Sequence, residues 1–88
     1  MKKYFQLNIL TSAKSIYKGE ISSLIAPGEL GFLGVLANHA PLITNLVAGK
    51  IIFRGSSGEQ TVIQSKSKGF MEVLKNQATL LLDDPENE

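Results

Sequence analysis

The 88-residue sequence contains no cysteine. This absence excludes a disulfide framework, a thiolate zinc site and a cysteine nucleophile, and it is compatible with a reducing compartment. No run approaches the ~20 apolar residues of a transmembrane helix, and Met1 is followed by two lysines and an alternating segment rather than by the apolar block of a signal peptide. We therefore expect a cytoplasmic protein with no direct membrane insertion.

The sequence also lacks an excess of charge of either sign. Nine Lys and Arg residues oppose eight Asp and Glu residues, which gives a net charge of +1, and aromatic residues make up only 7% of the chain. Nucleic-acid binding would require a basic surface interleaved with aromatic side chains. We therefore expect no nucleic-acid partner. Four of the eight acids lie in the last six residues, so the body of the chain is mildly basic and its tail is acidic.

Side chains suited to catalysis are scarce as well. His39 is the single histidine, and the two aspartates, Asp83 and Asp84, lie in the acidic tail, so a hydrolytic triad is nearly excluded. The glycines at Gly31 and Gly34 are followed by Val and Leu rather than by the Lys and Ser/Thr of a phosphate loop, and they indicate a tight turn or a close backbone approach instead. We expect no catalytic residue, no cofactor and no metal site.

His39 stands two residues before Pro41, where the chain is pushed toward extended geometry. Two roles remain open for this histidine. It either satisfies the hydrogen bonds of a rigid exposed connection or contacts a partner, because rigid loops often carry binding residues.

Period-two alternation of apolar and polar residues recurs about every ten residues, with turn residues between the runs. The predicted strands are residues 4–10, 21–25, 51–53, 60–64, 69–74 and 78–82. Pro27-Gly28 should end the second of these strands, and the third should be buried on two faces. Residues 55–58 should form a hairpin turn, and residues 75–77 should join the last two strands. The pattern predicts an all-β fold, a small antiparallel β-sandwich in preference to a closed barrel.

Apolar pairs such as Ile9-Leu10 and Leu42-Ile43 place apolar groups on both faces of the expected sheets. A contiguous apolar patch on the outside of so small a domain is a liability unless something covers it. We therefore expect a permanent protein partner on one outer face, with self-association as the alternative.

The stretch from Gly31 to Ile43 reads Gly-Phe-Leu-Gly-Val-Leu-Ala-Asn-His-Ala-Pro-Leu-Ile. It resembles the G-x-x-G-I/V-L-P-x-H-A-P-L signature of the epsilon subunit of F-type ATP synthases. The resemblance extends to Tyr-Lys-Gly-Glu-Ile at residues 17–21 and to Lys-Gly-Phe-Met-Glu-Val at residues 68–73. It implies an amino-terminal β-sandwich of about ten short strands over residues 1–82. Residues 83–88 should form an acidic tail where the family's inhibitory helical hairpin would begin, and we expect this chain to lack that hairpin.

The resemblance further implies a non-catalytic rotor subunit that binds the gamma subunit and the c-subunit ring of a proton-translocating ATP synthase. Such a subunit would lie peripherally on the cytoplasmic face of a bacterial plasma membrane, or on the equivalent stromal face in a chloroplast. The expected gamma contacts are Thr11, Ser12, Asn38, His39, Ala40, Pro41, Leu42 and Ile43. The expected c-ring contacts are Gly28, Glu29 and Phe32. The family often has an acid where this chain has Phe32, so Glu29 should supply the charge instead.

Two other classes of protein remain as alternatives. A swinging-arm carrier domain is also a small β-sandwich, with Lys50 or Lys68 as its lipoyl- or biotinyl-bearing residue, although neither lysine has the expected neighbours. A self-associating adaptor would instead pair its own apolar face with a second copy.

Overall fold

The computed structural model describes residues 1–83, and these residues form eight β-strands. The strands are β1 Phe5–Thr11, β2 Ser15–Gly28, β3 Gly31–Leu36, β4 Leu42–Leu46, β5 Gly49–Gly55, β6 Gln60–Ser65, β7 Gly69–Leu74 and β8 Gln77–Leu82. The predicted all-β sandwich is thereby confirmed. In the described part of the chain, eight strands are enough to form the sandwich, because the long strand β2 takes part in both layers. Of the predicted acidic tail, only Asp83 lies within the described residues.

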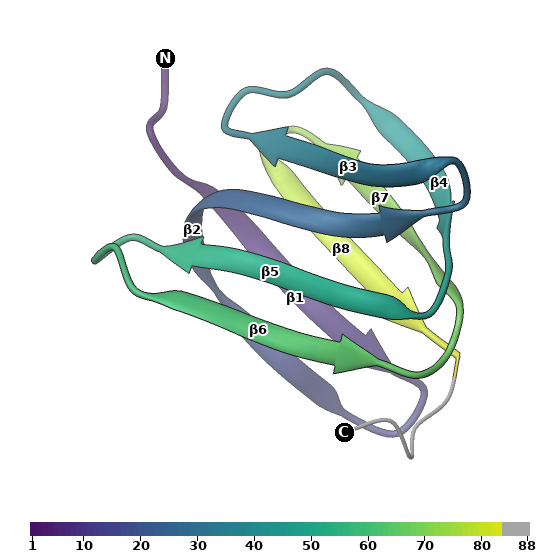
Figure 1. Ribbon diagram of the computed structural model, residues 1–88. Coiled ribbons are helices and arrows are strands. Elements are labelled where there is room, and N and C mark those ends of the chain that lie inside the picture. The colour runs from purple at the N-terminus through teal and green to yellow at the C-terminus, as the bar shows by residue number, and fades with distance from the viewer. Residues whose placement is uncertain (84–88) are drawn as a thin grey trace.

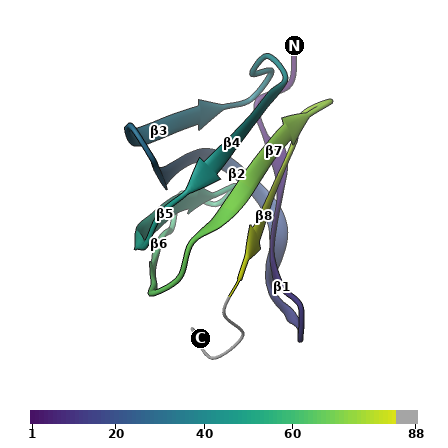
Figure 2. The same cartoon turned by 90° about the vertical axis from the view of Figure 1, so that its right-hand side faces the viewer.

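The strands are arranged in two layers (Figures 1 and 2). The rear layer of Figure 1 has the strand order β1-β8-β7-β4, and the front layer has the order β3-β2-β5-β6. The amino-terminal half of β2 pairs with β1 in the rear layer, and its carboxyl-terminal half pairs with β3 and β5 in the front layer. The outer surfaces of the two layers are called the rear face and the front face below.

The core follows from strict alternation in β1. Phe5, Leu7 and Ile9 are buried, and the residues between them are half-buried on the rear face. Apolar side chains of all the strands except β6 complete the core between the layers, with the ring of Tyr17 4.4 Å from that of Phe53. The alternation that predicted this strand is therefore confirmed, since a strand covered on one face buries every second residue.

Strand β2 begins six residues before the strand predicted at residues 21–25, and it departs from the prediction in two further respects. The pairing with β5 shifts register between Ile21 and Ser23, which marks a β-bulge. Beyond the bulge Leu24 is buried and Ile25 is exposed, because one extra residue reverses the alternation. Pro27 does not end the strand as predicted: it pairs with Phe32 of β3, and its carbonyl accepts a hydrogen bond from the Val47 N–H at 2.8 Å.

The turn predicted between Gly31 and Gly34 is also misplaced. The chain reverses at Glu29 and Leu30, and Gly31 takes a φ of 126° at the start of β3. This positive φ favours glycine because the residue has no Cβ. Phe32 and Gly34 are therefore strand residues rather than turn residues. The two hairpins predicted further along the chain are confirmed as β5–β6 and β7–β8.

Strand β5 was predicted to be buried on two faces, but it is buried on one. Ile51 and Phe53 lie in the core, whereas Ile52 is half-buried on the front face.

One strand pair in the rear layer is parallel. The first and last strands, β1 and β8, lie side by side with Gln6 opposite Gln77 and Thr11 opposite Leu82. The β7–β8 pairing brings Gly69 against the backbone of Leu81 and Leu82, where an added Cβ would overlap the Leu81 carbonyl oxygen. The glycine at position 69 thus permits the close strand approach at this end of the sheet.

Candidate functional site

The residues expected to contact partners lie at two opposite ends of the rear layer. One, called the Asn38 end, contains the segment Asn38–Pro41 that joins β3 to β4, together with Lys2 and the β7–β8 turn. The other, called the Glu29 end, contains the β2–β3 turn. Because strand residues advance about 3.3 Å each, the two ends of β1 are about 20 Å apart.

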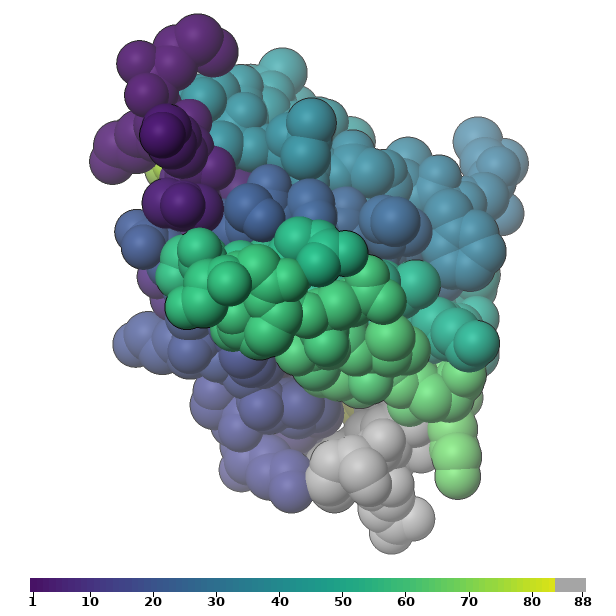
Figure 3. All heavy atoms as spheres, turned by 60° about the vertical axis from the view of Figure 1, so that its left-hand side comes forward, coloured from purple at the N-terminus to yellow at the C-terminus, as the bar shows by residue number. Residues whose placement is uncertain are grey.

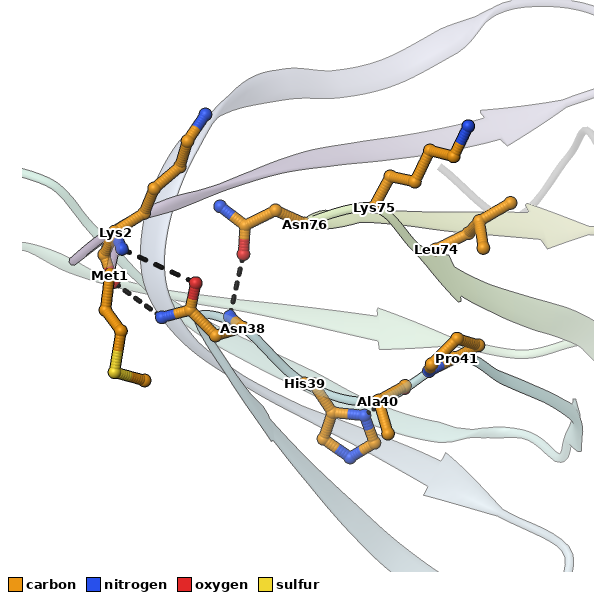
Figure 4. A pocket seen from close by; sticks show the side chains of 9 residues that line it. All are labelled: Met1, Lys2, Asn38, His39, Ala40, Pro41, Leu74, Lys75 and Asn76. Atoms are coloured by element: carbon orange, nitrogen blue, oxygen red, sulfur yellow. Dashed lines mark hydrogen bonds between the residues drawn. The ribbon is translucent and has the colours of Figure 1, made fainter.

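Two asparagines tie the Asn38 end together (Figure 4). The Asn38 N–H donates to Oδ1 of Asn76 at 2.7 Å, and the Asn38 side-chain amide donates to the Lys2 carbonyl at 2.8 Å. The Asn76 side-chain amide donates to the Tyr4 carbonyl at 2.7 Å. Both asparagines have positive φ, 68° and 62°, a conformation that asparagine tolerates better than most residues. The connection between the layers is therefore fixed to the rear layer and to the amino-terminal segment.

Figure 3 shows the amino-terminal residues, in purple, against the blue segment that follows β3. An open hollow of about 820 Å³ lies at this corner. Its lining residues are Met1, Lys2, Asn38, His39, Ala40, Pro41, Leu74, Lys75 and Asn76. The lining thus combines two basic residues, Lys2 and Lys75, with apolar side chains such as Pro41 and Leu74.

His39 is half-buried at the surface of the same connection, and its Nδ1 lies 2.6 Å from the Ala40 carbonyl oxygen. A carbonyl oxygen only accepts, so Nδ1 carries the proton in this contact and Nε2 is the acceptor of the neutral ring. Within residues 1–83, no carboxylate is hydrogen-bonded to this ring. The arrangement suits a hydrogen bond to a partner rather than general-base catalysis, which needs an oriented base beside a nucleophile.

Beyond Pro41 the chain enters β4, and its side chains alternate between the core and the rear face. Leu42 packs against the core, whereas Ile43 is 73% exposed on the rear face. Leu42 and Ile43 were both predicted as gamma contacts, and Ile43 is therefore the one that a partner can reach.

The rear face carries further apolar side chains. Cross-strand pairing aligns Asn45, Phe70, Leu81 and Leu10 in one row across β4, β7, β8 and β1. The exposed or half-buried apolar residues of the rear face are Leu10, Ile43, Phe70, Leu74 and Leu81. A shallow hollow of about 440 Å³ lies between β4 and β7 at this face. The sequence predicted apolar side chains on the outside of the sheets, and the structure has them on both faces, since Phe32, Leu36 and Val62 are exposed on the front face.

Thr11 and Ser12 are not brought next to Asn38–Ile43. Pairing runs from Thr11 through Leu82 and Gly69 to Leu46 and on to Gly28, which puts Thr11 at the Glu29 end of the rear layer. Thr11 is buried, and its hydroxyl oxygen accepts hydrogen bonds from the backbone N–H groups of residues 13 and 14 at 3.2 Å each. Its polar group is thus used within the β1–β2 turn, and Ser12 is the exposed member of the pair.

At the Glu29 end, the three residues expected to contact the c ring share one hairpin. Gly28 is buried, while Glu29 is exposed at the turn and Phe32, three residues after Glu29, is 65% exposed. The Asn45 side-chain amide donates to Glu29 Oε1 at 3.3 Å, which links the turn to the end of β4. A carboxylate and an aromatic ring are thus presented together by a hairpin that the rest of the domain supports.

Several surface residues of the two ends were not singled out from the sequence. Asn76 and the rear-face residues Phe70 and Leu74 were assigned only to a turn and a strand. A signal for Asn76 existed, because an asparagine in a two-residue link between apolar runs favours a left-handed turn conformation. A signal for Phe70 existed as well, because alternation along β7 puts it on the same face as the charged Glu72.

The two lysines considered for a carrier domain do not lie at a hairpin tip. Lys50 is the second residue of β5 and pairs with Gln64. Lys68 precedes β7, and its carbonyl accepts a hydrogen bond from the Asp83 N–H at 2.9 Å. Residues 1–83 include no helix of the length and apolar character that a membrane crossing requires.

Comparison with known sequences identifies related proteins. The sequence profile of the family described as "ATP synthase, Delta/Epsilon chain, beta-sandwich domain" matches residues 4–88. The ATP synthase epsilon chain of Leptospira interrogans is 40% identical over 78 residues, which cover 89% of this chain and 60% of that one. The epsilon chain of Dichelobacter nodosus is 38% identical over 84 residues, which cover 96% of this chain and 58% of that one. The chain thus spans about three fifths of the length of these relatives.

Solved structures with the same fold are found at lower sequence identity. A chain in the cryo-EM structure of the Euglena gracilis mitochondrial ATP synthase, OSCP/F1/c-ring in rotational state 1, has a TM-score of 0.87 at 16% identity. That match covers 96% of this chain and 53% of the other. A chain in the Tetrahymena thermophila mitochondrial ATP synthase central stalk and c-ring has a TM-score of 0.76 at 17% identity, with 94% and 65% covered. At these identities the matches show a shared fold.

Proposed function

Since the chain belongs to the family of the ATP synthase delta/epsilon chain β-sandwich domain, we propose that it is a non-catalytic subunit of the enzyme's central stalk. In this role it binds the gamma subunit and the c-subunit ring and couples rotation to ATP synthesis. The observation that carries the proposal is the family match over residues 4–88. The Gly31–Ile43 signature resembled the same family.

The rear face and the Asn38 end form the proposed gamma-binding surface. Ile43 supplies the most exposed apolar side chain of this face, and His39 Nε2 supplies a hydrogen-bond acceptor in the connection that leads into β4. Apolar anchors surrounded by polar groups are what a protein interface requires at its centre. The rigid Asn38–Asn76 contact supports this assignment, because a pre-ordered loop loses less entropy on binding.

Thr11 and Ser12 are also proposed gamma contacts, and in this arrangement gamma lies diagonally across the rear face. The row Phe70, Leu81 and Leu10 leads from β7 toward the carboxyl end of β1. A partner that covered this row would contact Ile43 at one side and Ser12 at the other. In this arrangement Thr11 shapes the turn that presents Ser12.

The β2–β3 hairpin is the proposed contact with the c ring. Glu29 offers a carboxylate to polar groups of the ring, and Phe32 offers apolar area beside it. Gly28 contributes through the shape of the hairpin, since an added Cβ would meet the Gly31 carbonyl and the Leu33 side chain. With this contact the subunit would lie peripherally at the cytoplasmic face of a bacterial membrane or its stromal equivalent.

Co-expression with the gamma subunit of the same organism tests the proposal. We expect the two proteins to co-elute as a one-to-one complex in size-exclusion chromatography, with the mass measured by light scattering. A folded chain, judged by circular dichroism, that elutes apart from folded gamma at micromolar concentration would contradict the gamma-binding role. Intact mass of the purified chain would reveal a lipoyl or biotinyl group if the carrier-domain alternative held.

A further inference from the structure

Strand β3 forms an unprotected edge of the front layer. It pairs with β2 on one side, and no other described strand pairs with it (Figures 1 and 2). Its six residues, Gly31–Leu36, include no charged side chain and no proline. Edge strands of soluble proteins are usually protected by charge, proline or a bulge, because an open edge pairs with other chains. The edge of β3 has none of these features.

The hydrogen-bonding groups on this open edge can be assigned from the hairpin. A two-residue turn is closed by a hydrogen-bonded pair, here Gly28 and Gly31, and such pairs alternate along an antiparallel ladder. The pair Pro27 and Phe32 is therefore not hydrogen-bonded. Two observations agree: Pro27 has no N–H, and its carbonyl bonds to Val47 on the other side. The main-chain groups of Phe32, Gly34 and Leu36 thus point away from β2.

The side chains of the same three residues share the front face. Phe32 is 65% exposed and Leu36 is 64% exposed, while a Cβ added to Gly34 would meet no atom within 4 Å. The edge consequently presents one large apolar side chain on each side of a notch at Gly34. The pattern is symmetric about Gly34.

We propose that the β3 edge binds the β3 edge of a second copy of this chain, antiparallel, with the two-fold axis at Gly34. In this register Phe32 lies opposite Leu36 of the second copy, and each opposed pair exchanges both of its N–H···O bonds. The aromatic side chains cover the notch at the two facing glycines, as aromatic neighbours do for edge glycines elsewhere. An uncharged edge brings no like charges together at the axis.

The dimer is expected to be weak, and this agrees with the proposed rotor function. A six-residue strand on each side is well below the 20–30 residues of a standard interface. Phe32 also belongs to the surface proposed for the c ring, so a chain bound in the rotor would not pair in this way. Self-association therefore belongs to the free subunit.

Sedimentation equilibrium tests the proposal. The protein concentration should run from about 10 µM to 1 mM, because chains with a small interface associate in this range. We expect the weight-average mass to rise from 9.5 kDa toward twice that value. Leu36→Lys should abolish the rise by bringing charge to the edge. Val62→Lys is the matched control, because Val62 is 49% exposed on the other edge strand, β6, and it should associate like the wild type.

Amide hydrogen exchange measured by NMR at the two ends of this range locates the contact. We expect exchange of the Phe32, Gly34 and Leu36 amides to slow at high concentration, with the β6 amides unchanged. A mass that stays at 9.5 kDa up to about 1 mM, an association that Leu36→Lys retains, or protection that appears on β6 instead would each overturn the proposal. Gamma binding does not enter these measurements, so their failure leaves the proposed function intact.

Discussion

Asn38 and Asn76 are joined by a 2.7 Å hydrogen bond from the backbone N–H of the first to Oδ1 of the second. The bond connects the segment between β3 and β4 to the turn between β7 and β8. Strand β7 pairs with β4 in the rear layer. Both residues take left-handed backbone conformations. The position of His39 and the entry of β4 therefore depend on a turn that is 38 residues further along the chain.

Removing the Asn76 side chain should lower the stability of the domain. Asn76→Gly keeps the left-handed backbone but loses the acceptor for the Asn38 N–H and the donor to the Tyr4 carbonyl. We expect a loss of about 1–2 kcal/mol in the free energy of unfolding, measured in urea. Asn76→Ala should lose about 1 kcal/mol more, because alanine also pays for the left-handed conformation. Equal stability of Asn76→Gly and the wild type would refute the role of these bonds.

Thr11 gives a second test through its buried hydroxyl. Its oxygen accepts from the backbone N–H groups of Ala13 and Lys14. Thr11→Val should cost about 1–3 kcal/mol in unfolding free energy, because two amides of the turn lose their acceptor. Thr11→Ser retains the hydroxyl and should cost clearly less. If both variants lost the same stability, the methyl packing rather than the hydroxyl would be responsible.

Two glycines, one in each layer, should respond oppositely to alanine. A Cβ at Gly69 would overlap the Leu81 carbonyl, whereas a Cβ at Gly34 would meet nothing within 4 Å. Gly69→Ala should therefore destabilise the domain by about 2–3 kcal/mol through strain between β7 and β8. Gly34→Ala should be neutral or slightly stabilising, because alanine loses less chain entropy on folding. Thermal unfolding of both variants in one buffer decides whether this ranking holds.

Glu29 is expected to act on coupling and not on gamma binding. Glu29→Gln removes one exposed charge from the β2–β3 turn and should weaken the ring contact by about 0.2–1 kcal/mol. ATP-driven proton pumping in reconstituted vesicles should fall, while the affinity for soluble gamma stays unchanged. Glu59→Gln, in the exposed β5–β6 turn, is the control for loss of a charge. A parallel fall in gamma affinity would move Glu29 to the gamma-binding surface.

The elements that sequence reasoning predicted well are those governed by neighbouring residues. Strict alternation in β1 and turn chemistry at residues 55–58 and 75–77 gave the correct strand and hairpins, because each depends on a few adjacent side chains. The reversal of alternation after Ile21 depends on a bulge against β5, which is more than 30 residues away in the sequence. Pro27 remains in a strand because its neighbour on β3 requires no hydrogen bond from it.

The candidate site shows the same division. The hairpin with Glu29 and the connection with His39 could be located from turn residues and a signature. The end of the rear layer at which each contact residue lies could not be predicted, since it depends on the parallel pairing of β1 with β8. That pairing separates Thr11 from Asn38. The exposure of Ile43 rather than Leu42 depends instead on which face β4 turns outward when it pairs with β7.

Calorimetric titration of purified gamma with matched surface variants decides whether the rear face binds gamma. Ile43→Asp changes an exposed residue of the rear face, and Val62→Asp changes an exposed residue of the front face. If Ile43 is an anchor of the interface, the first variant should weaken binding by about 30-fold or more, and the second should bind like the wild type. Wild-type affinity in a folded Ile43→Asp variant would contradict the account.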